Sequence, residues 1–244
     1  MCTLTAIPVE ECVRLAFNRD ELRSRPLALP PRTRPFGQRR AVLPLDPISA
    51  GTWIGVNDAG VALALLNVNQ GKVKKTSGQS RGTIIPALLH CDSLSSTIAA
   101  AEVLDVSECG SFRLVIADQE MLAELHSEDG SIQLVGQNRM VQPCLFTSSG
   151  LGDHHVEGPR RKLFEEAFAQ DGDLADLQDF FHRHRWPGRP HLSVCMSRPD
   201  AWTVSHTIID LGRDTIALRY HPKPPDRPAG TTTVTLRRIL GGVA

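Results

Sequence analysis

The second residue of the chain is a cysteine, and its position gives it a particular chemistry. Small second residues generally permit removal of the initiator methionine, and Cys2 would then carry both a thiol and a free α-amine. The amine has a reference pKa of about 7.7 to 8.0 and the thiol one of about 8.5, so the amine can take the thiol proton near neutral pH. Cys2 is therefore a candidate nucleophile with its own base. If Met1 is retained, this mechanism fails.

A second polar cluster, Asn18-Arg19-Asp20-Glu21, ends an apolar stretch and opens an arginine-rich one. The apolar runs 2–7 and 12–17, joined by residues 8–11, predict a β-hairpin that brings this cluster close to Cys2. A buried carboxylate must find a cation or several N–H donors. We therefore expect Asp20 to be at least partly buried, close to Cys2 and paired with a basic group, either the N-terminal amine or Arg19.

The remaining apolar runs predict the elements that must position these residues. Strands are expected at 52–56, 61–66, 112–117, 121–126, 132–135, 144–147, 192–196, 202–209, 215–220 and 231–236. Helices are expected at 83–90 and 93–104, from Pro159 onward, and over the apolar face that begins at Leu174. The strands of 52–56 and 61–66 form a second hairpin that should lie beside the first, because sequential strands tend to be neighbours.

Antiparallel strands with helices in two blocks predict an α+β fold, a four-layer αββα sandwich of two mainly antiparallel sheets. We expect residues 1–244 to form one domain. Two proline-rich segments interrupt the pattern. Residues 23–49 are expected to be a structureless lid over the site or a surface loop, and residues 222–230 a connection between strands.

The composition narrows the function further. The chain has 27 basic and 27 acidic residues, which gives no global field for nucleic acid or an anionic membrane and favours a small-molecule partner. No apolar run reaches the roughly 20 residues of a membrane span, and no secretory signal is evident, so we expect a cytoplasmic protein. The six cysteines show no paired spacing, which argues against a disulfide framework or a zinc site. The sequence does not predict an oligomeric state.

Several motifs resemble known families. Met1-Cys2-Thr3 followed by Asn18-Arg19-Asp20-Glu21 resembles the NRDE family, which includes the transport and Golgi organisation proteins. The resemblance continues through Gly51-Thr52-Trp53-Ile54-Gly55-Val56-Asn57, Leu65-Leu66-Asn67 and Ser80-Arg81-Gly82. More distantly, Cys2 with Gly55-Val56-Asn57-Asp58-Ala59-Gly60 and Leu65-Leu66-Asn67 is similar to choloylglycine-hydrolase-type N-terminal-nucleophile amidases. This resemblance implies the same αββα sandwich.

The resemblance to the amidases implies roles for four catalytic candidates. Asp20 would hold the amine of the nucleophile Cys2, Arg19 would polarise the thiol or bind a substrate carboxylate, and Asn67 would donate to the oxyanion. The amidases place arginine three residues before aspartate, whereas Arg19 and Asp20 are adjacent and would point to opposite faces of a strand. Alternatively, Arg19 and Asp20 form a structural ion pair with the loop from Arg23 to Arg40, and Asn67 is a strand-end asparagine bonded to its own backbone.

The same motifs and their neighbours supply the candidate substrate-binding residues: Asn18, Glu21, Trp53, Asn69, Arg81 and Ser148. The second asparagine and the late arginine of the amidases have no clear match. No histidine cluster has the spacing of a zinc site, so no metal is expected. The adjacent His90 and Cys91 are either a weak haem-iron signal or a buried pair.

Two functions remain from the sequence. The first is an N-terminal-nucleophile amidase or acyl hydrolase, without a cofactor, that acts on a C–N amide or thioester bond of a small carboxylate- or phosphate-bearing substrate. The alternative is a non-catalytic binding or trafficking protein for haem or an acyl-CoA-like lipophilic ligand, which needs no complete catalytic set.

Overall fold

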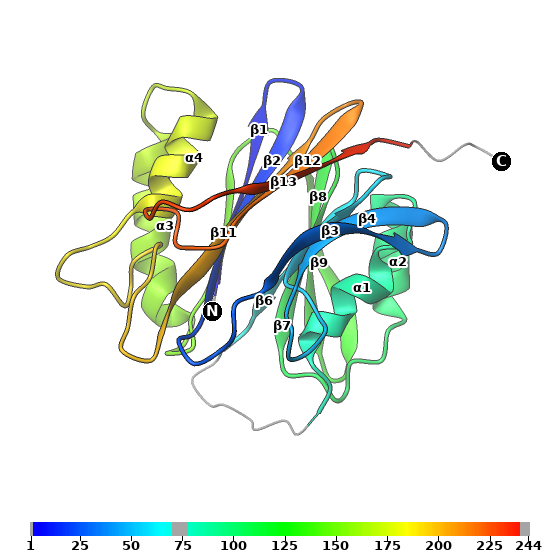
Figure 1. Cartoon of the computed structure of the whole chain (residues 1–244), viewed down its shortest axis with the longest axis horizontal. Helices are drawn as coiled ribbons and strands as arrows, with labels where there is room; N and C mark the ends of the chain where they lie inside the picture. Colours follow the sequence, from blue (N-terminus) through cyan, green and yellow to red (C-terminus); the bar gives the residue numbers. More distant parts are fainter. Residues whose placement is uncertain (1, 70–77, 240–244) are drawn as a thin grey trace.

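The computed structural model describes residues 2–69 and 78–239. Two antiparallel β-sheets stack face to face, and a pair of helices covers the outer face of each sheet (Figure 1). The six-stranded sheet has the order β10 (Cys144–Ser148), β1 (Cys2–Val9), β2 (Cys12–Leu22), β11 (Ala201–Leu211), β12 (Thr215–His221), β13 (Thr232–Arg237). The seven-stranded sheet has the order β3 (Leu29–Phe36), β4 (Arg39–Leu45), β5 (Ile54–Asn57), β6 (Ala62–Asn67), β7 (Phe112–Ala117), β8 (Met121–Glu128), β9 (Ser131–Arg139). The fold is therefore the expected α+β αββα sandwich.

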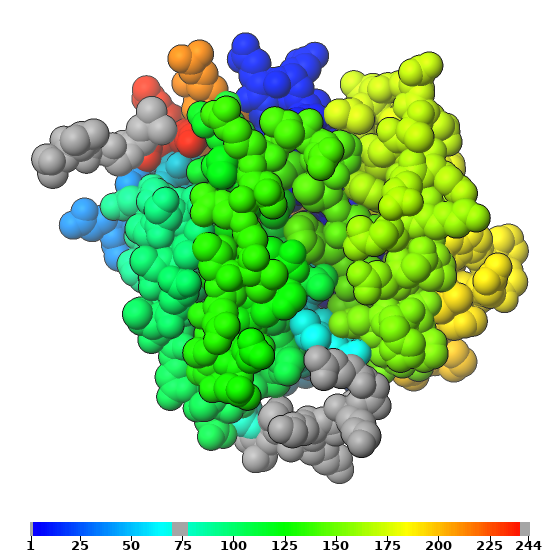
Figure 2. Space-filling view, turned by 180° about the vertical axis from the view of Figure 1, so that it is seen from behind, coloured from blue at the N-terminus to red at the C-terminus, as the bar shows by residue number. Residues whose placement is uncertain are grey.

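The helices form the two outer layers. A 3₁₀ turn (Arg81–Thr83), α1 (Ile84–Leu88) and α2 (Leu94–Glu102) pack on the seven-stranded sheet, while α3 (His154–Phe168) and α4 (Leu174–Arg183) pack on the six-stranded sheet. In the view from behind, the surface runs from teal over α2, through green over β8 and β9, to yellow-green over α3 and α4 (Figure 2). Successive side chains of a strand point to opposite sides of its sheet, so each sheet has one face toward the other sheet and one face toward its helices.

The layers differ in what fills them. Apolar side chains such as Leu4, Phe17 and Val56 fill the space between the sheets, and a second apolar cluster lies under α1 and α2. The space under α3 and α4 contains a small apolar cluster around Phe181 and a larger set of buried polar side chains. This third layer is where Arg160, Asn18 and His206 lie. Buried polar groups of this kind must satisfy one another by hydrogen bonds.

One expectation about the first 67 residues was wrong. Residues 23–49 are not a structureless lid or loop, because most of them form the hairpin of β3 and β4. Pro30 and Pro31 fit there because they lie in an irregularity of the pairing with β4, and Pro35 fits because β3 is an edge strand. The second hairpin, β5 and β6, is a neighbour of the first as expected, but in the other sheet: β6 contacts β1 across the core.

Two further boundaries differ. Residues 192–196 form turns instead of a strand, because their carbonyls bond to side chains: Leu192 and Ser193 accept from Arg160, and Val194 accepts from Asn18. The helix expected to begin at Pro159 begins at His154, so Pro159 lies inside α3. The other helices and strands were predicted in place, including the serine cap of α2, where Ser93 accepts from the Ser96 N–H at 3.1 Å. Residues 222–230 connect β12 to β13.

Candidate functional site

A polar cavity of about 370 Å³ opens between the two sheets, where β1 begins and β6 ends. It contains Cys2 and most of the candidates predicted from the sequence. Its wall consists of Cys2, Arg19, Asp20, Glu21, Arg25, Asp46, Ser49, Gly51, Thr52, Trp53, Leu65, Asn67, Gly78, Gln79, Ser80, Arg81, Gly82 and Gly110. The described wall is mainly charged and polar, with Trp53 and Leu65 as the large apolar side chains.

Cys2 begins β1 and is 7% exposed. It is opposite Arg19 on β2 and Ser148 on β10, and its backbone nitrogen donates to Ser148 Oγ at 3.1 Å. Burial raises the pKa of the Cys2 thiol, and the Asp20 carboxylate adds to the rise, while Arg19 and the Asp20 backbone N–H act against it. The thiol is therefore protonated at neutral pH and needs a base before it can attack a carbonyl.

Residues 18–21 lie near the end of β2, where Asn18 is opposite Thr3 and Arg19 is opposite Cys2, and their side chains alternate between the two faces of the sheet. Arg19 points into the space between the sheets, where its guanidinium lies 4.1 Å from the centre of the Trp53 ring. Asn18 points to the helical layer and donates to the carbonyls of His182 and Val194. Arg19 and its neighbours in sequence therefore serve different sides of the sheet, as the spacing predicted.

Asp20 is 3% exposed, which confirms that it is buried, and it lines the cavity with Cys2. Thr203 Oγ1 donates to Asp20 Oδ1 at 2.6 Å, whereas Asp20 Oδ2 is buried without a hydrogen-bond partner among the described residues. Burial raises the pKa of Asp20, and the nearby Arg160 guanidinium and the Thr203 hydroxyl oppose the rise. A buried carboxylate oxygen without a donor is costly and indicates a missing cation or N–H group.

The expected pairing of Asp20 with Arg19 was wrong. Arg19 Nη2 donates to Asp46 Oδ2 at 2.7 Å and to Glu21 Oε2 at 3.3 Å. Asp46 also accepts from Arg25 at 2.8 Å, and although burial raises its pKa, bonds from Arg25 and the Ser49 N–H lower that pKa well below its usual range on balance. The pairing differs because Arg19 and Asp20 are on opposite faces of β2. The other expected partner, the N-terminal amine of residue 1, lies outside the described residues.

The opposite wall of the cavity comes from the seven-stranded sheet and the segment after it. Asn67 ends β6, and Arg81 begins the 3₁₀ turn, where its guanidinium donates to the carbonyl of Ser111 at 3.0 Å. Among the described residues, Arg81 has no carboxylate within ion-pair distance. Two glycines let this wall form: a Cβ on Gly51 would lie 2.5 Å from the carbonyl carbon of Gly82. Arg81 is thus the cavity cation left for a ligand.

Three predicted substrate-binding residues do not line the cavity. Asn18 faces the helical layer, on the other side of β2. Asn69 is held through its backbone, because its N–H donates to Asp153 Oδ2 at 3.1 Å and its carbonyl accepts from Asp153 N. Ser148 is bonded to the nitrogen of Cys2 and supports the nucleophile from behind. The other candidates, Glu21, Trp53 and Arg81, line the cavity.

Sequence reasoning missed four residues that shape the site. Asp46 and Arg25 were inside the segment taken for a lid, and they flank the β3 and β4 hairpin that returns the chain to the cavity. Thr203 and Arg160 are distant in sequence and meet Asp20 only in the folded chain. The proline-rich run between Arg25 and Asp46 resembled a loop, whereas Arg160 carried no local signal at all.

The structure is similar to solved N-terminal-nucleophile hydrolase folds. A C2A mutant of conjugated bile acid hydrolase from Clostridium perfringens aligns with a TM-score of 0.56 and 11% identity, over 96% of this chain and 92% of that chain. A second variant of that hydrolase aligns with a TM-score of 0.51 and 12% identity over 100% of both chains. A Caenorhabditis elegans N-acylethanolamine-hydrolyzing acid amidase ortholog gives 0.56 and 10%, over 93% and 94%. These likenesses define the class of fold.

The sequence comparison is more specific. Residues 2–170 match the family described as Transport and Golgi organisation 2. The chain therefore belongs to this family, as the NRDE resemblance predicted. A search of curated protein sequences found no significant match.

The structure bears on two other expectations. Within residues 2–69 and 78–239, no helix combines the length and the apolar character needed to cross a bilayer. No cluster of His, Cys, Asp and Glu side chains in the same described ranges is arranged to bind a metal. His90 and Cys91 lie at the end of α1, where Cys91 Sγ is 3.8 Å from His90 Nε2, and neither residue lines the Cys2 cavity.

Proposed function

We propose that the protein is a cysteine N-terminal-nucleophile hydrolase that cleaves a C–N amide or thioester bond in a small substrate bearing a carboxylate or phosphate. The observation that carries this proposal is the environment of Cys2. Its thiol faces a polar cavity and its nitrogen is bonded to Ser148 Oγ. Asp20 also lines this cavity, and one of its buried carboxylate oxygens has no described partner. Removal of Met1 would supply an ammonium group beside that carboxylate.

The reaction would begin with transfer of the Cys2 thiol proton to its own amine, since the raised pKa of the thiol makes a base necessary. The sulfur then attacks the carbonyl carbon, and the carbonyl electron pair moves to oxygen. Asn67 would donate to this oxyanion from the opposite wall. When the oxyanion collapses, the bond to the leaving group breaks and the ammonium returns its proton to that group, which leaves a thioester on Cys2.

Water would complete the reaction. The Cys2 amine takes a proton from the water as the oxygen attacks the thioester, and the carboxylic acid leaves while the sulfur regains its proton. Asp20 would hold the amine in position during both halves and stabilise its ammonium form. Arg19, fixed by Asp46 and the Trp53 ring, would lower the pKa of the thiol and complete the cavity wall. Arg81 would bind the substrate anion, because the charges of Arg19 and Arg25 are already paired with Asp46.

A hydrolysis assay tests this proposal. N-acyl amino acids with a free carboxylate should release the amino acid, and the Cys2→Ala variant should be inactive. Arg81→Gln should raise KM for these substrates about tenfold or more, from the loss of one charge-assisted hydrogen bond, and leave the corresponding carboxamide-capped substrates unchanged. Turnover that persists in Cys2→Ala would contradict the proposal.

The competing function is a carrier for haem or an acyl-CoA-like ligand. The described cavity wall offers mainly Trp53 and Leu65 to an apolar chain, which favours a polar substrate. Titration with haem and with acyl-CoA separates the two functions. Saturable binding without turnover of any acyl substrate would support the carrier and replace the hydrolase.

A further inference from the structure

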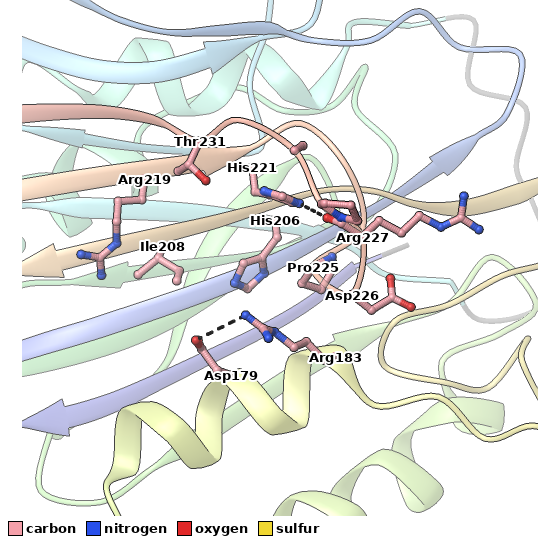
Figure 3. A pocket seen from close by; sticks show the side chains of 12 residues that line it. Asp179, Arg183, His206, Ile208, Arg219, His221, Pro225, Asp226, Arg227 and Thr231 are labelled. Carbon is pink, nitrogen blue, oxygen red and sulfur yellow. Dashed lines mark hydrogen bonds and ion pairs between the residues drawn. The ribbon is translucent and has the colours of Figure 1, made fainter.

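A second cavity, of about 480 Å³, lies on the outer face of the six-stranded sheet, beside α4. Its floor is formed by β11 and β12, and its rim by α4 and the 225–231 segment: Asp179, Arg183, His206, Ile208, Arg219, His221, Pro225, Asp226, Arg227, Pro228, Ala229 and Thr231. It shares no lining residue with the Cys2 cavity. Figure 3 shows Arg183 reaching from α4, and His206 and His221 from the strands, toward the same space.

His206 is the buried polar group of this cavity, at 7% exposure. Its Nδ1 is 2.8 Å from Asn18 Oδ1. Both carbonyl contacts of Asn18 are made by Nδ2, which donates to His182 and Val194, so the Oδ1 atom must accept and His206 Nδ1 must carry a proton. No described residue bonds to the other ring nitrogen, Nε2. In the neutral ring, Nε2 is an acceptor that needs a donor from outside the protein.

The surroundings of His206 are cationic. Arg14 and Arg219 share the single carboxylate of Asp210, which leaves one positive charge in excess. Arg183 has only a loose contact with Asp179, at 4.0 Å, and Asp226 is paired with Arg185. Arg227 has no carboxylate partner among the described residues and lies 5.4 Å from the Trp202 ring. Burial, together with the nearby charges of His221, Arg183, Arg14 and Arg219, lowers the pKa of His206 to about 3, so its ring is neutral at physiological pH.

His221 adds a second acceptor. Its Nε2 is 2.7 Å from the carbonyl oxygen of Arg227, so Nε2 must carry a proton and Nδ1 is free of one in the neutral ring. This bond also ties the 222–230 segment to β12, and it fixes the rim of the cavity. The cavity therefore combines arginine donors with imidazole acceptors.

We propose that this cavity binds a small phosphate monoester. Its anionic oxygens would be held by Arg183 and Arg219, and its P–OH group would donate to His206 Nε2. A singly protonated phosphate offers both kinds of contact, because it carries negative oxygens and one O–H donor, and its second pKa of about 6 keeps this form populated at mildly acid pH. Sulfate is a tetrahedral oxyanion similar in size to inorganic phosphate, but at pH 6 it is a dianion without a proton to donate. The acceptor nitrogen of His206 thus distinguishes the two anions.

Isothermal titration calorimetry on the full chain at pH 6.0 tests this proposal, with glycerol 3-phosphate, inorganic phosphate and sulfate at equal ionic strength. Both phosphates should bind about tenfold or more tightly than sulfate. Arg183→Gln should weaken glycerol 3-phosphate binding about tenfold, whereas Arg213→Gln, which removes the same charge at the exposed turn between β11 and β12, should leave it unchanged.

Three results would overturn the proposal. One is no saturable binding of either phosphate to a folded protein. Another is equal affinity for phosphate and sulfate, unaffected by Arg183→Gln, which indicates nonspecific charge attraction. The third is binding to vesicles that contain phosphatidate without binding to glycerol 3-phosphate, which would assign the surface to a lipid headgroup. Cys2→Ala should bind glycerol 3-phosphate like the parent chain, so this test does not depend on the hydrolase activity.

Discussion

Asp20 affects both the proposed chemistry of the site and the stability of the fold. Its carboxylate is buried, one oxygen accepts from Thr203, and the other has no described partner. Because burial raises its pKa, the charged carboxylate destabilises the folded chain as described. An ammonium group on Cys2, formed after Met1 is removed, would pair with this carboxylate and offset the loss of stability.

Asp20→Asn should therefore separate function from stability. At pH values between the ordinary aspartate pKa of 3.8 and the raised pKa of Asp20 in the folded chain, Asp20 is protonated when folded and ionised when unfolded. The contribution of Asp20 to stability therefore falls as pH rises through this range. Removal of the charge in a chain that retains Met1 should leave the free energy of unfolding at pH 7 unchanged or raise it by about 1 kcal/mol. The rate of Cys2 acylation in the processed chain should fall. Urea unfolding and adduct kinetics measure the two effects, and a large loss of stability at pH 7 would show that Asp20 is already paired.

Asn67 is the second residue whose role has a clear signature. Asn67→Ala should lower kcat by about 100-fold to 1,000-fold, the usual cost of one oxyanion donor, with little effect on KM. Asn69→Ala is the matched control, because Asn69 is held through its backbone and lies outside the cavity wall. Steady-state kinetics of both variants test this role, which is wrong if the two variants behave alike.

At the scale of elements, β2 places polar side chains on both faces of the six-stranded sheet. Arg19 faces the cavity between the sheets, and Asn18 faces the helical layer, where α3 contributes the buried Arg160. Arg160 donates to Thr3 and Thr147 on the strands and to the carbonyls of residues 192 and 193. It therefore joins α3 to β1 and β10. Among the charged groups, its guanidinium has the largest lowering effect on the pKa of Asp20.

Arg160→Met should destabilise the fold strongly. The substitution leaves two carbonyls and two hydroxyls without their donor and Asp20 without its compensating charge, so we expect a loss of about 3 to 5 kcal/mol. Arg161→Met, at the next position on α3, removes an exposed pair with Glu157 and should cost less than about 1 kcal/mol. Denaturant unfolding of the two variants gives the comparison; similar midpoints would refute a structural role for Arg160.

The positions of the helices and strands were more predictable than the hydrogen-bond and ion-pair partners of the buried side chains. Local alternation and turn residues predicted the strands from Phe112 onward and the hairpin that brings residues 18–21 to Cys2. Prolines on the edge strand β3 obscured a hairpin, because a missing N–H is tolerated at an edge but suggests a loop in the sequence. The pairing of Arg19 with Asp46 and of Asp20 with Thr203 depends on which face each side chain occupies and on contacts across 27 and 183 positions, which no local pattern encodes.

For the whole molecule, the six-stranded sheet separates two cavities of different chemistry. The Cys2 cavity lies on its inner face and the His206 cavity on its outer face, and the adjacent residues Asn18 and Arg19 each point toward one of them. The layer between this sheet and the helices holds His182 and His206 in the neutral state, since burial lowers both pKa values, that of His206 to about 3.

This layer should make the fold sensitive to acid. Below the pKa of about 6.5 for an unfolded histidine, His182 and His206 bind protons in the unfolded chain but not in the folded chain. The free energy of unfolding therefore falls as pH decreases from 6.5 toward 3. Each histidine should contribute about 1.4 kcal/mol per pH unit in this range. Urea unfolding at pH 7, 6 and 5 measures the slope. A free energy of unfolding that is constant between pH 7 and 5 would contradict the neutral histidines.

The most direct test of the central claim is the mass of the mature chain and of its acyl adduct. Intact-mass spectrometry of the purified protein should show loss of Met1, and incubation with an activated acyl ester should add one acyl group that peptide mapping places on Cys2. The other five cysteines should remain unmodified on the same timescale, because they lack an amine base. Retention of Met1, or a processed chain whose Cys2 forms no adduct, would contradict the assignment of Cys2 as an N-terminal nucleophile.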